Sequence, residues 1–239
     1  MNFGIIAAGE GSRLMQEGSD VPKPLVELDG MPMIGRLIRI FIESGADSIN
    51  VVVNPAMPEV VAYLEDLKKN INVDLKFMVK STPSSMHTLG ELIKLAGDDD
   101  KIIVTTVDTV FKEEKFRRYA EKFAVTGEDI DALMGITDYI EDEKPLYISV
   151  ASDDDIISFD DLPSAEVKYI SAGIYGLGPR CFPVLRNALE NGVHRMRNYQ
   201  RELIAEGLKV KAFDIGKVID VDHVSDISRA RLLIAEKSF

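Results

Sequence analysis

Short apolar runs alternate with longer amphipathic segments through the first third of this chain, and this alternation is the strongest constraint on its fold. Residues 3–8, 49–53 and 73–79 have the apolar or alternating character of strands. Between them, apolar residues recur at helical spacing over 34–42 and 57–69. This βαβαβ order predicts an α/β fold with a largely parallel sheet and helices on both faces. Ligands of such folds gather beyond the carboxyl ends of the strands.

The remaining two thirds of the chain continue the alternation. An apolar, β-branched run over 102–107 is too short for a helix and predicts a central strand that ends at Asp108. Further strands are predicted over 132–137, 146–151, 156–159 and 210–213, and helices through 116–123, 182–189 and 227–234, with another helix beginning near His194. Because no break in composition divides the chain, we expect residues 1–239 to form a single domain.

The charge balance limits the kinds of partner. The 239 residues carry a net charge of −12, whereas a surface for nucleic acid or an anionic membrane needs a basic face. An anionic substrate must therefore be met by a few local cations and by a metal ion. Cys181 is the only cysteine, which excludes an internal disulfide and a cysteine-based zinc site. The chain begins in a strand without a secretory leader, and no apolar run approaches membrane-spanning length, so we expect a soluble cytoplasmic protein and leave a homo-oligomer open.

The loop after the first strand has the composition of a phosphate-binding site. Gly9 and Gly11 permit backbone conformations and close approaches that a Cβ atom would block. Arg13 offers a planar fork of donors for phosphate oxygens, and Lys23, between two prolines, offers a compact point charge. The dinucleotide-binding pattern fails because Leu14 occupies its third glycine position, and no Walker lysine follows at the required spacing. We therefore predict a triphosphate-binding loop in which Arg13 and Lys23 are the catalytic cations.

Three segments together resemble the signature of the nucleotidyltransferases that join an NTP to a sugar 1-phosphate or a similar phosphorylated acceptor. They are Ala7-Ala8-Gly9-Glu10-Gly11-Ser12-Arg13-Leu14, Pro22-Lys23-Pro24-Leu25-Val26 and Gly30-Met31-Pro32-Met33-Ile34. Ser12 stands where the family usually has threonine and keeps the hydroxyl group. The resemblance implies a three-layer α/β/α Rossmann-like nucleotidyltransferase fold with a mixed, mainly parallel central sheet. It also implies a nucleotide-binding part over about 1–110 and an acceptor-binding part over about 111–239.

The same resemblance assigns the substrate-binding residues. In the family, a turn that opens a helix reads the nucleobase, and Ser84 and Ser85 stand in that place here. Residues 169–175 resemble a family strand whose glycine lets the acceptor approach the backbone, which implies an acceptor site at Ser171 and Gly173. Other nucleotide contacts are expected from the loop residues Ala7, Ala8, Gly9, Gly11 and Ser12. The expected substrates are an NTP and a phosphorylated small-molecule acceptor.

Three aspartates are predicted to serve a magnesium site. Asp108 ends a central strand at the edge where the glycine loop lies, and its segment resembles the family element whose aspartate holds Mg²⁺ against the triphosphate. Asp220 and Asp222 are two residues apart, so on a strand they would share a face and point at one ion. Their segment resembles the family's second metal site. We expect Asp108 and Asp222 to be direct ligands, and Asp220 to orient Asp222 or to bind a water molecule.

One element of the family is missing from its usual place. The family usually carries Glu-Lys-Pro soon after the hairpin formed by the predicted strands 146–151 and 156–159, with the lysine on phosphate and the glutamate on the sugar. Residues 159–163 here read Phe-Asp-Asp-Leu-Pro. A Glu143-Lys144-Pro145 segment precedes the hairpin, and we interpret it as a chance match. Asp153 to Asp155 are interpreted as a solvated hairpin turn in which nothing nearby pairs the carboxylates, and Arg195 and Arg197 are interpreted as solvated helix charges.

The main hypothesis is an enzyme that transfers a nucleoside monophosphate from an NTP to a sugar 1-phosphate, with Mg²⁺, and releases pyrophosphate. One alternative is a cytidylyltransferase for phosphocholine or another small phospho-alcohol, because the Asp220–Asp222 pattern is closer to that branch. Another is a catalytically silent protein that binds a nucleotide or sugar nucleotide. The Pro22-Lys23-Pro24 element disfavours a guanylyltransferase of molybdenum-cofactor type.

Overall fold

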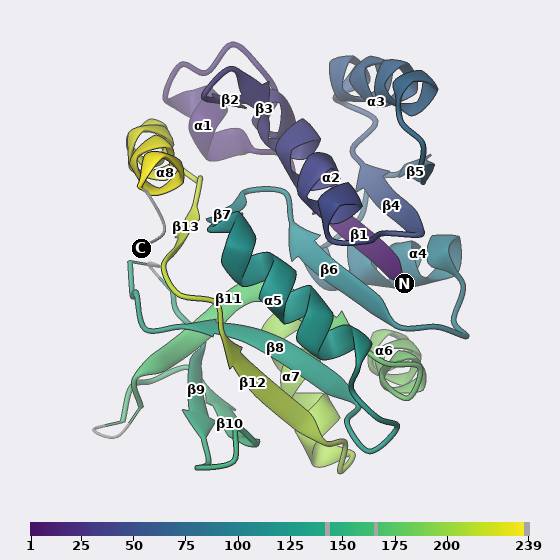
Figure 1. Ribbon diagram of the computed structural model, residues 1–239, viewed down its shortest axis with the longest axis vertical. Helices are drawn as coiled ribbons and strands as arrows, with labels where there is room; N and C mark the ends of the chain where they lie inside the picture. Colours follow the sequence, from purple (N-terminus) through teal and green to yellow (C-terminus); the bar gives the residue numbers. More distant parts are fainter. Residues whose placement is uncertain (142–143, 165–166, 237–239) are drawn as a thin grey trace.

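The computed structural model describes residues 1–141, 144–164 and 167–236, and its centre is a mixed sheet (Figure 1). Its strands are β1 Asn2–Ala7, β4 Ser48–Val53, β5 Asp74–Val79, β6 Ile102–Thr106, β8 Ala132–Thr137, β9 Tyr147–Val150, β10 Ile156–Asp160, β11 Tyr169–Leu177 and β12 Val210–Asp214. They lie in the order β10-β9-β11-β6-β1-β4-β5, with β8 also beside β11 and β12 beside β8. Parallel pairing joins β6, β1, β4 and β5, and also β8 and β12. Strand β11 pairs antiparallel with β6, β8 and β9, so it connects the parallel part to the rest of the sheet.

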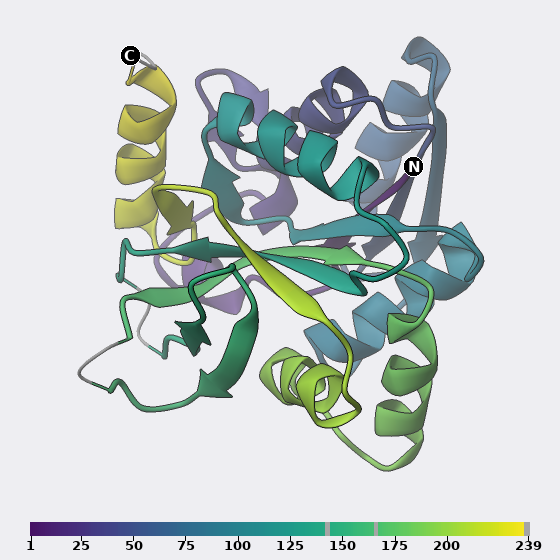
Figure 2. The ribbon, with the colours of Figure 1, turned by 60° about the horizontal axis from the view of Figure 1, so that its bottom comes forward.

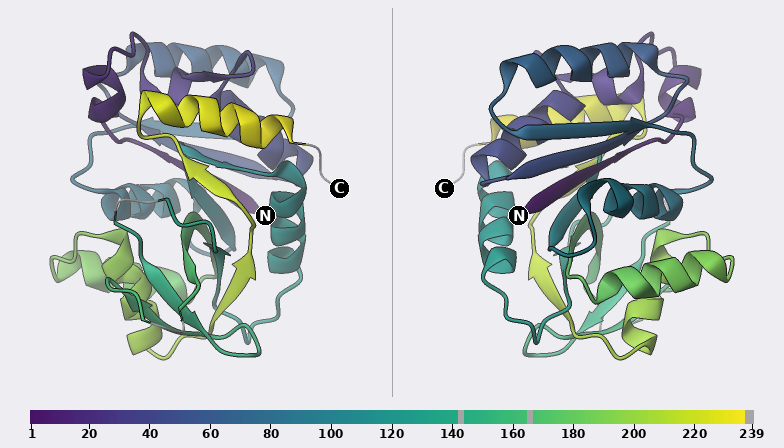
Figure 3. Two further views of the ribbon diagram at one scale, coloured as in Figure 1. Left: turned by 90° about the vertical axis from the view of Figure 1, so that its left-hand side faces the viewer. Right: turned by 90° about the vertical axis from the view of Figure 1, so that its right-hand side faces the viewer.

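Helices cover both faces of this sheet, as the turned views in Figures 2 and 3 show. One face carries α2 Met33–Glu43, α3 Pro58–Asn70 and α5 Glu113–Ala124, and the other carries α4 Ser85–Ala96, α6 Cys181–Glu190 and α7 Met196–Ala205. A hydrophobic core lies between the sheet and each set of helices, and successive strand residues point into one core and then the other. Ile5 and Val51 face the first set of helices, while Ile6 and Val52 face the second. Burial of one such side chain contributes roughly 1.5–3 kcal/mol, and β1 and β4 accordingly have buried residues on both faces. Within the described ranges, no helix is long and apolar enough to cross a membrane.

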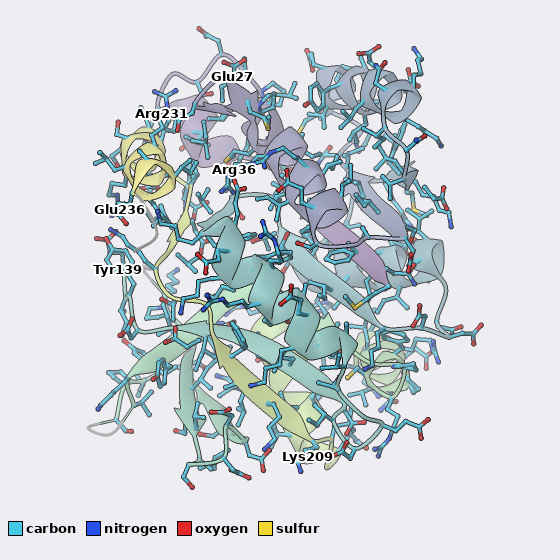
Figure 4. All side chains as sticks on the ribbon, viewed as in Figure 1. Glu27, Arg36, Tyr139, Lys209, Arg231 and Glu236 are labelled. Atoms are coloured by element: carbon cyan, nitrogen blue, oxygen red, sulfur yellow. The ribbon has the colours of Figure 1, made fainter. Side chains whose placement is uncertain are left out.

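A third, smaller core attaches the C-terminal helix α8 (Val224–Ala235) to the part of the chain that follows the glycine loop. It lies beside two short ladders, β2 Glu27–Leu28 with β3 Met31–Pro32, and β7 Thr109–Phe111 with β13 Val218–Asp220. Leu233 of α8 joins the apolar cluster that contains Leu14 of the short helix α1 (Ser12–Gln16). Arg231 of α8 donates to the carbonyl oxygen of Glu27 over 3.0 Å (Figure 4). This packing places the Asp220 segment beside the glycine loop.

The predicted three-layer α/β/α architecture with a mixed sheet is confirmed. The sheet continues past residue 110, because β11 pairs directly with β6. The division into a nucleotide-binding and an acceptor-binding part stays a prediction.

The interpretation of the hairpin turn as unpaired was wrong. Lys211 Nζ lies 2.7 Å from Asp155 Oδ1 and 3.4 Å from Asp153 Oδ2. An isolated bridge between Asp155 and Lys211 brings β12 to the turn. The lysine comes from a distant strand, so no local pattern could indicate the pairing.

Candidate active site

Three parallel strands end at the same edge of the sheet. The register pairs Ile6 of β1 with Thr106 of β6, and Ala7 of β1 with Val53 of β4. The residues that follow these strands therefore gather there. Asn54, which follows β4, is buried, and its Nδ2 atom donates to the carbonyl oxygen of Ala8 over 3.0 Å. Sequence reasoning missed Asn54, although a polar residue directly after an apolar strand was a usable signal.

The glycine loop forms one wall of a pocket of about 450 Å³, which we call the loop pocket. Gly11 has φ +62°, and a Cβ atom there would lie 2.8 Å from Cβ of Lys23, so a residue without a side chain is required. Gly9 shows neither constraint, since a Cβ atom there would have nothing within 4 Å. Of the predicted nucleotide-binding residues, Ala7 packs in the core and is not part of the lining, and its contact with a nucleotide stays a prediction. The loop pocket is lined by Ala8, Gly9, Gly11, Ser12, Lys23, Asn54, Ser84, Ser85, Thr106 and Asp108, among others.

A second pocket of about 480 Å³, which we call the strand pocket, opens beside β11. Both predicted acceptor residues, Ser171 and Gly173, line it. The two pockets share Ser84, Ser85, Thr106 and Asp108, so they meet at the end of β6. The remaining polar lining of the strand pocket is Lys144, Tyr175, His194, Arg195, Arg197, Gln200, Asp220 and Asp222.

Lys23 lies between two of the predicted metal-binding carboxylates. Its Nζ atom contacts Asp108 Oδ2 and lies 2.7 Å from Asp222 Oδ1. Burial disfavours the charged lysine, but the two carboxylates outweigh that effect, and the pKa of Lys23 is raised. The ammonium group therefore stays protonated and joins residues from opposite ends of the chain.

Arg13 lies further from the loop pocket than the sequence suggested. Its Nη1 atom is 3.1 Å from Asp222 Oδ2, and its side chain is half exposed. Arg13 lines a neighbouring cavity together with Asp222 and His223. The structure thus brings Arg13, Lys23, Asp108 and Asp222 into one chain of ion pairs, with Asp222 between the two cations.

The backbone at Asp222 is held by the start of α8. Asp226 is buried and accepts from the backbone N–H groups of Asp222 and His223, at 3.0 and 2.8 Å. Burial raises the pKa of this carboxyl group, but the hydrogen bonds from Arg229 and these backbone groups outweigh it, and the pKa of Asp226 is lowered. Glu17 accepts from the backbone N–H of Val224 over 2.8 Å. Asp226 and Glu17 are positioning residues that sequence reasoning missed.

Asp220 has a different environment from Asp222, so the expectation that they share the face of a strand was wrong. Strand β13 ends at Asp220, and the N–H of Asp222 donates back to the Asp220 carbonyl oxygen over 3.1 Å, which bends the chain. Asp220 Oδ1 accepts from Thr109 Oγ1 over 3.0 Å. Both aspartates still line the strand pocket.

Gly173 lies against the threonine that binds Asp220. It has φ +70°, and a Cβ atom there would lie 2.9 Å from Thr109 Oγ1. The register between β11 and β8 also shifts between Ser171 and Tyr175, as at a β-bulge. The glycine thus permits a close approach between β11 and the Thr109–Asp220 pair, and the acceptor role of Gly173 and Ser171 stays a prediction.

The donor set suits a magnesium ion with few protein ligands. No group of three or more His, Cys, Asp or Glu side chains within the described residues is arranged to hold an ion. The oxygens of Asp108 and Asp222, however, already converge on one cation, the ammonium group of Lys23. Mg²⁺ in phosphate-binding sites commonly uses one or two carboxylates and fills its other positions with phosphate oxygens and water. Asp108 and Asp222 fit that pattern, and the role of Asp220, which accepts from Thr109, stays a prediction.

Ser84 caps the N-terminus of α4. Its Oγ atom accepts from the backbone N–H of His87 and lies 2.9 Å from His87 Nδ1. This is the local role that a serine before a helix commonly has. Ser85 is exposed and lies where the two pockets meet. Contact between these serines and a nucleobase stays a prediction.

Three cations in the strand pocket were not predicted to belong to any site. Lys144, Arg195 and Arg197 all line it. Three aspartates, Asp108, Asp220 and Asp222, line the same pocket. The interpretation of Arg197 as a solvated helix charge was wrong, since its guanidinium contacts Asp161 and donates to the Lys144 carbonyl oxygen. Glu143 lies outside the described residues.

Comparison with known sequences assigns this chain to a protein family. The model of the family described as nucleotidyl transferase matches residues 4–235. The bifunctional protein GlmU of Methanocaldococcus jannaschii is 24% identical over 230 residues, which cover 91% of this chain and 52% of that protein. Mannose-1-phosphate guanyltransferase of Aspergillus fumigatus is 31% identical over 120 residues, which cover 49% of this chain and 32% of that protein. The chain therefore matches about half the length of the first relative and about a third of the second.

Two solved structures share the fold across nearly the whole chain. A candidate glucose-1-phosphate thymidylyltransferase from Bacillus anthracis superposes with a TM-score of 0.84 at 19% identity, and the match covers 100% of this chain and 97% of that one. The inositol-1-phosphate CTP transferase from T. maritima superposes with a TM-score of 0.77 at 16% identity, and the match covers 98% of each chain. At these identities the likeness concerns the fold.

Proposed function

The chain belongs to the nucleotidyl transferase family, and from this we propose that it transfers a nucleoside monophosphate from an NTP to a sugar 1-phosphate. An oxygen of the acceptor phosphate attacks the α-phosphorus, the bond from that phosphorus to the β-phosphate bridging oxygen breaks, and pyrophosphate leaves. The names of two relatives, a mannose-1-phosphate guanyltransferase and a candidate glucose-1-phosphate thymidylyltransferase, support a sugar 1-phosphate as the acceptor class.

One observation carries the proposal, namely the junction of the loop pocket and the strand pocket at Asp108, Ser84, Ser85 and Thr106. A transfer between two phosphorylated molecules needs two adjacent sites with the α-phosphorus at their boundary. Lys23 lines the loop pocket and contacts Asp108, one of the residues that the two pockets share. The triphosphate would lie in the loop pocket, and the acceptor in the strand pocket.

The residues of the chain act by position and charge. Lys23 neutralises charge that develops on the leaving pyrophosphate, and Arg13 supports it from beyond Asp222. To do so, Lys23 must exchange at least one of its carboxylate contacts for a phosphate oxygen. Asp226 keeps the backbone of Asp222 in place while that exchange occurs.

We further propose that Asp108 and Asp222 hold Mg²⁺ when the NTP is bound. The ion would supply charge neutralisation and orientation for the phosphate oxygens. Displacement of Lys23 from the two carboxylates frees their oxygens for this role. Asp220, bound to Thr109, would orient a neighbouring group or a water molecule.

A substrate matrix tests the proposal. Each of four NTPs is incubated with Mg²⁺ and with hexose 1-phosphates, sugar acid 1-phosphates, inositol 1-phosphate or phosphocholine, and pyrophosphate release is measured. Turnover with a sugar 1-phosphate is the expected result. Turnover with phosphocholine or inositol 1-phosphate alone would favour the cytidylyltransferase alternative. Binding of an NTP without turnover for any acceptor would favour the silent binding protein.

A further inference from the structure

One wall of the strand pocket carries a glutamine that is almost completely buried. Gln200 of α7 is 1% exposed, and it lines the pocket together with Ser171 and Tyr175 of β11. We propose that the side-chain amide of Gln200 binds a ring hydroxyl group of the acceptor and so selects a sugar or polyol phosphate. This proposal rests on the function proposed above and specifies its acceptor.

Gln200 occupies a core position of its helix. The buried residues of α7 are Met196, Tyr199, Gln200 and Leu203, which recur at the spacing of one helix face. Met196, Tyr199 and Leu203 belong to the apolar core on that side of the sheet. A buried polar side chain at such a position is costly unless its polar atoms are hydrogen-bonded. The partners of the Gln200 amide therefore decide what this residue does.

One of the two polar atoms of the Gln200 amide has a partner within the described part of the chain. Ser171 Oγ donates to Gln200 Oε1 over 3.4 Å, and a further hydrogen bond links the side chains of Ser171 and Tyr175. The Nε2 atom of Gln200 makes no hydrogen bond with any described residue. An amide nitrogen carries two N–H donors. Because Gln200 lines the strand pocket, these donors can bind an oxygen atom of a ligand there.

Several other polar side chains of the strand pocket are already engaged by protein groups. Arg197 pairs with a carboxylate, Asp220 accepts from Thr109, and Ser84 caps α4. Gln200 differs from them because it is nearly fully buried and its nitrogen is unpaired within the described residues. A buried donor without a partner is unfavourable, and a ligand oxygen that accepts from it removes that cost. Gln200 is therefore the group on this wall whose hydrogen bonding an acceptor completes.

A hydroxyl group suits this wall better than a quaternary ammonium group or a second phosphate. Burial is the main reason that the pKa of Tyr175 is raised, so its hydroxyl stays neutral beside the neutral side chains of Ser171 and Gln200. A ligand hydroxyl matches such groups because it can both donate and accept. A quaternary ammonium group is recognised by aromatic cages. Tyr175 is the sole Phe, Tyr or Trp among the described residues that line this pocket, so the wall favours a hydroxylated ring over phosphocholine.

The side-chain amide resonances of glutamine test the contact directly. Gln16 and Gln200 are the only glutamines of the chain, so isotopic labelling of glutamine side-chain nitrogens gives two amide pairs. Gln16 is exposed on α1 and is the internal control, and Gln200→Met identifies the Gln200 pair. The wild-type full chain is titrated separately with glucose 1-phosphate, mannose 1-phosphate, glucuronic acid 1-phosphate, inositol 1-phosphate, phosphocholine and inorganic phosphate.

We expect the Gln200 pair to shift with at least one of the four ring phosphates, and to stay in place with phosphocholine and with inorganic phosphate. The Gln16 pair should stay in place throughout. No Gln200 shift with any ring phosphate would overturn the inference. An equal shift with phosphocholine or inorganic phosphate would overturn it as well, because the ring hydroxyl groups would then be irrelevant.

Kinetics of Gln200 variants test the selection. Gln200→Met keeps the side-chain length and removes the amide, so the KM for the acceptor should rise about 3- to 10-fold, the range for one neutral hydrogen bond. The KM for NTP should change less than about twofold. Gln200→Glu keeps one oxygen and loses the N–H donors, and it should raise the KM for the acceptor at least as much. Gln16→Met is the matched control and should leave both KM values unchanged.

Urea unfolding separates substrate binding from a structural role. Gln200→Met replaces an amide whose nitrogen is unpaired with an apolar side chain of similar shape, so its unfolding midpoint should be unchanged or higher. A lower midpoint with unchanged KM values would show that Gln200 serves the core, and would contradict the inference. A wild-type KM for the acceptor in Gln200→Glu would contradict the role of the N–H donors.

These results also distinguish the inference from the proposed function. A Gln200 shift with a ring phosphate, without turnover in the substrate matrix, would overturn the proposed function alone. Turnover with a sugar 1-phosphate beside a wild-type KM in Gln200→Met and an unshifted Gln200 pair would overturn the inference alone. A Gln200 shift caused by an NTP without acceptor would place the nucleotide in the strand pocket, and would overturn the assignment of that pocket to the acceptor.

Discussion

The Nζ atom of Lys23 lies 2.7 Å from Oδ1 of Asp222, although 199 residues separate them in the sequence. The same ammonium group contacts Asp108, which follows the central strand β6. One lysine therefore joins the beginning, the middle and the end of the chain at the point where the two pockets meet. A substrate phosphate that draws Lys23 away would change the environment of both carboxylates at once.

Lys23→Ala and Arg13→Ala should each lower turnover by roughly 10²-fold or more at saturating substrates, the scale for loss of one preorganised donor to a developing anion. Lys23 should show the larger loss, because it lines the loop pocket and Arg13 lies beyond Asp222. Steady-state pyrophosphate release by purified, folded variants is the measurement, with Lys69→Ala as the charge control. Wild-type turnover in either variant would contradict its assignment.

Asp108→Asn and Asp222→Asn should each abolish Mg²⁺-dependent turnover, whereas Asp220→Asn should keep a measurable fraction and need more Mg²⁺. The reason is that Asp108 and Asp222 converge on one cation, while Asp220 is bound to Thr109. Mg²⁺ titrations of the three variants check this. An inactive Asp220→Asn beside an active Asp222→Asn would reverse the roles assigned to the two aspartates. Full activity in Asp108→Asn would contradict the proposed metal site.

Replacement of Ser85 by a bulky residue such as phenylalanine should change the ranking of the four NTPs. Ser85 is exposed at the start of α4 and lies in the lining of both pockets. A large side chain there would occupy the space expected for the base. The measurement is kcat/KM for each NTP with a fixed acceptor. An unchanged ranking with altered acceptor preference would assign Ser85 to the acceptor instead.

Gly173→Ala should lower the free energy of unfolding by about 1–3 kcal/mol, because a Cβ atom meets Thr109 and φ is in the left-handed region. Turnover should fall as well, since Thr109 binds Asp220. Urea unfolding checks the stability change. Gly9→Ala is the matched control, because its Cβ would have nothing within 4 Å, and it should unfold like the wild type. Equal stability of both variants would contradict the steric argument.

The contribution of Asp226 to stability should depend on acidity. Its pKa is lowered in the folded protein, so the contribution is present above the unfolded value near 3.8 and is lost as the pH falls through the folded value. At pH 7, Asp226→Asn should cost roughly 2 kcal/mol, because buried hydrogen bonds to a charged group are lost. Urea unfolding from pH 7 to pH 3 should show this difference shrinking below about pH 4. A difference that stays constant across that range would contradict the argument; the exposed Asp66→Asn is the control.

Local patterns in the sequence were sufficient for the layers of the fold and for two of its site residues. The strands of the parallel part alternate between two apolar cores, and Asp108 follows one of them directly, so strand periodicity placed it at the correct edge. Gly11 could also be predicted from the sequence, because glycine at a turn commonly marks a left-handed backbone or a close neighbour, and the structure has both there. These features depend on neighbouring residues alone.

Tertiary structure decided which charges meet. Lys144 and Arg197 were interpreted as a chance match and a solvated charge, yet a hydrogen bond between segments 53 residues apart connects them at the strand pocket. Asp220 and Asp222 are close in sequence, but a bend after β13 gives them different partners. Electrostatic and hydrogen-bonded contacts depend on distances of a few ångströms between side chains, and packing of distant segments sets those distances. Sequence spacing therefore indicated which residues lie at this edge, and only the folded chain determined how its charges are paired.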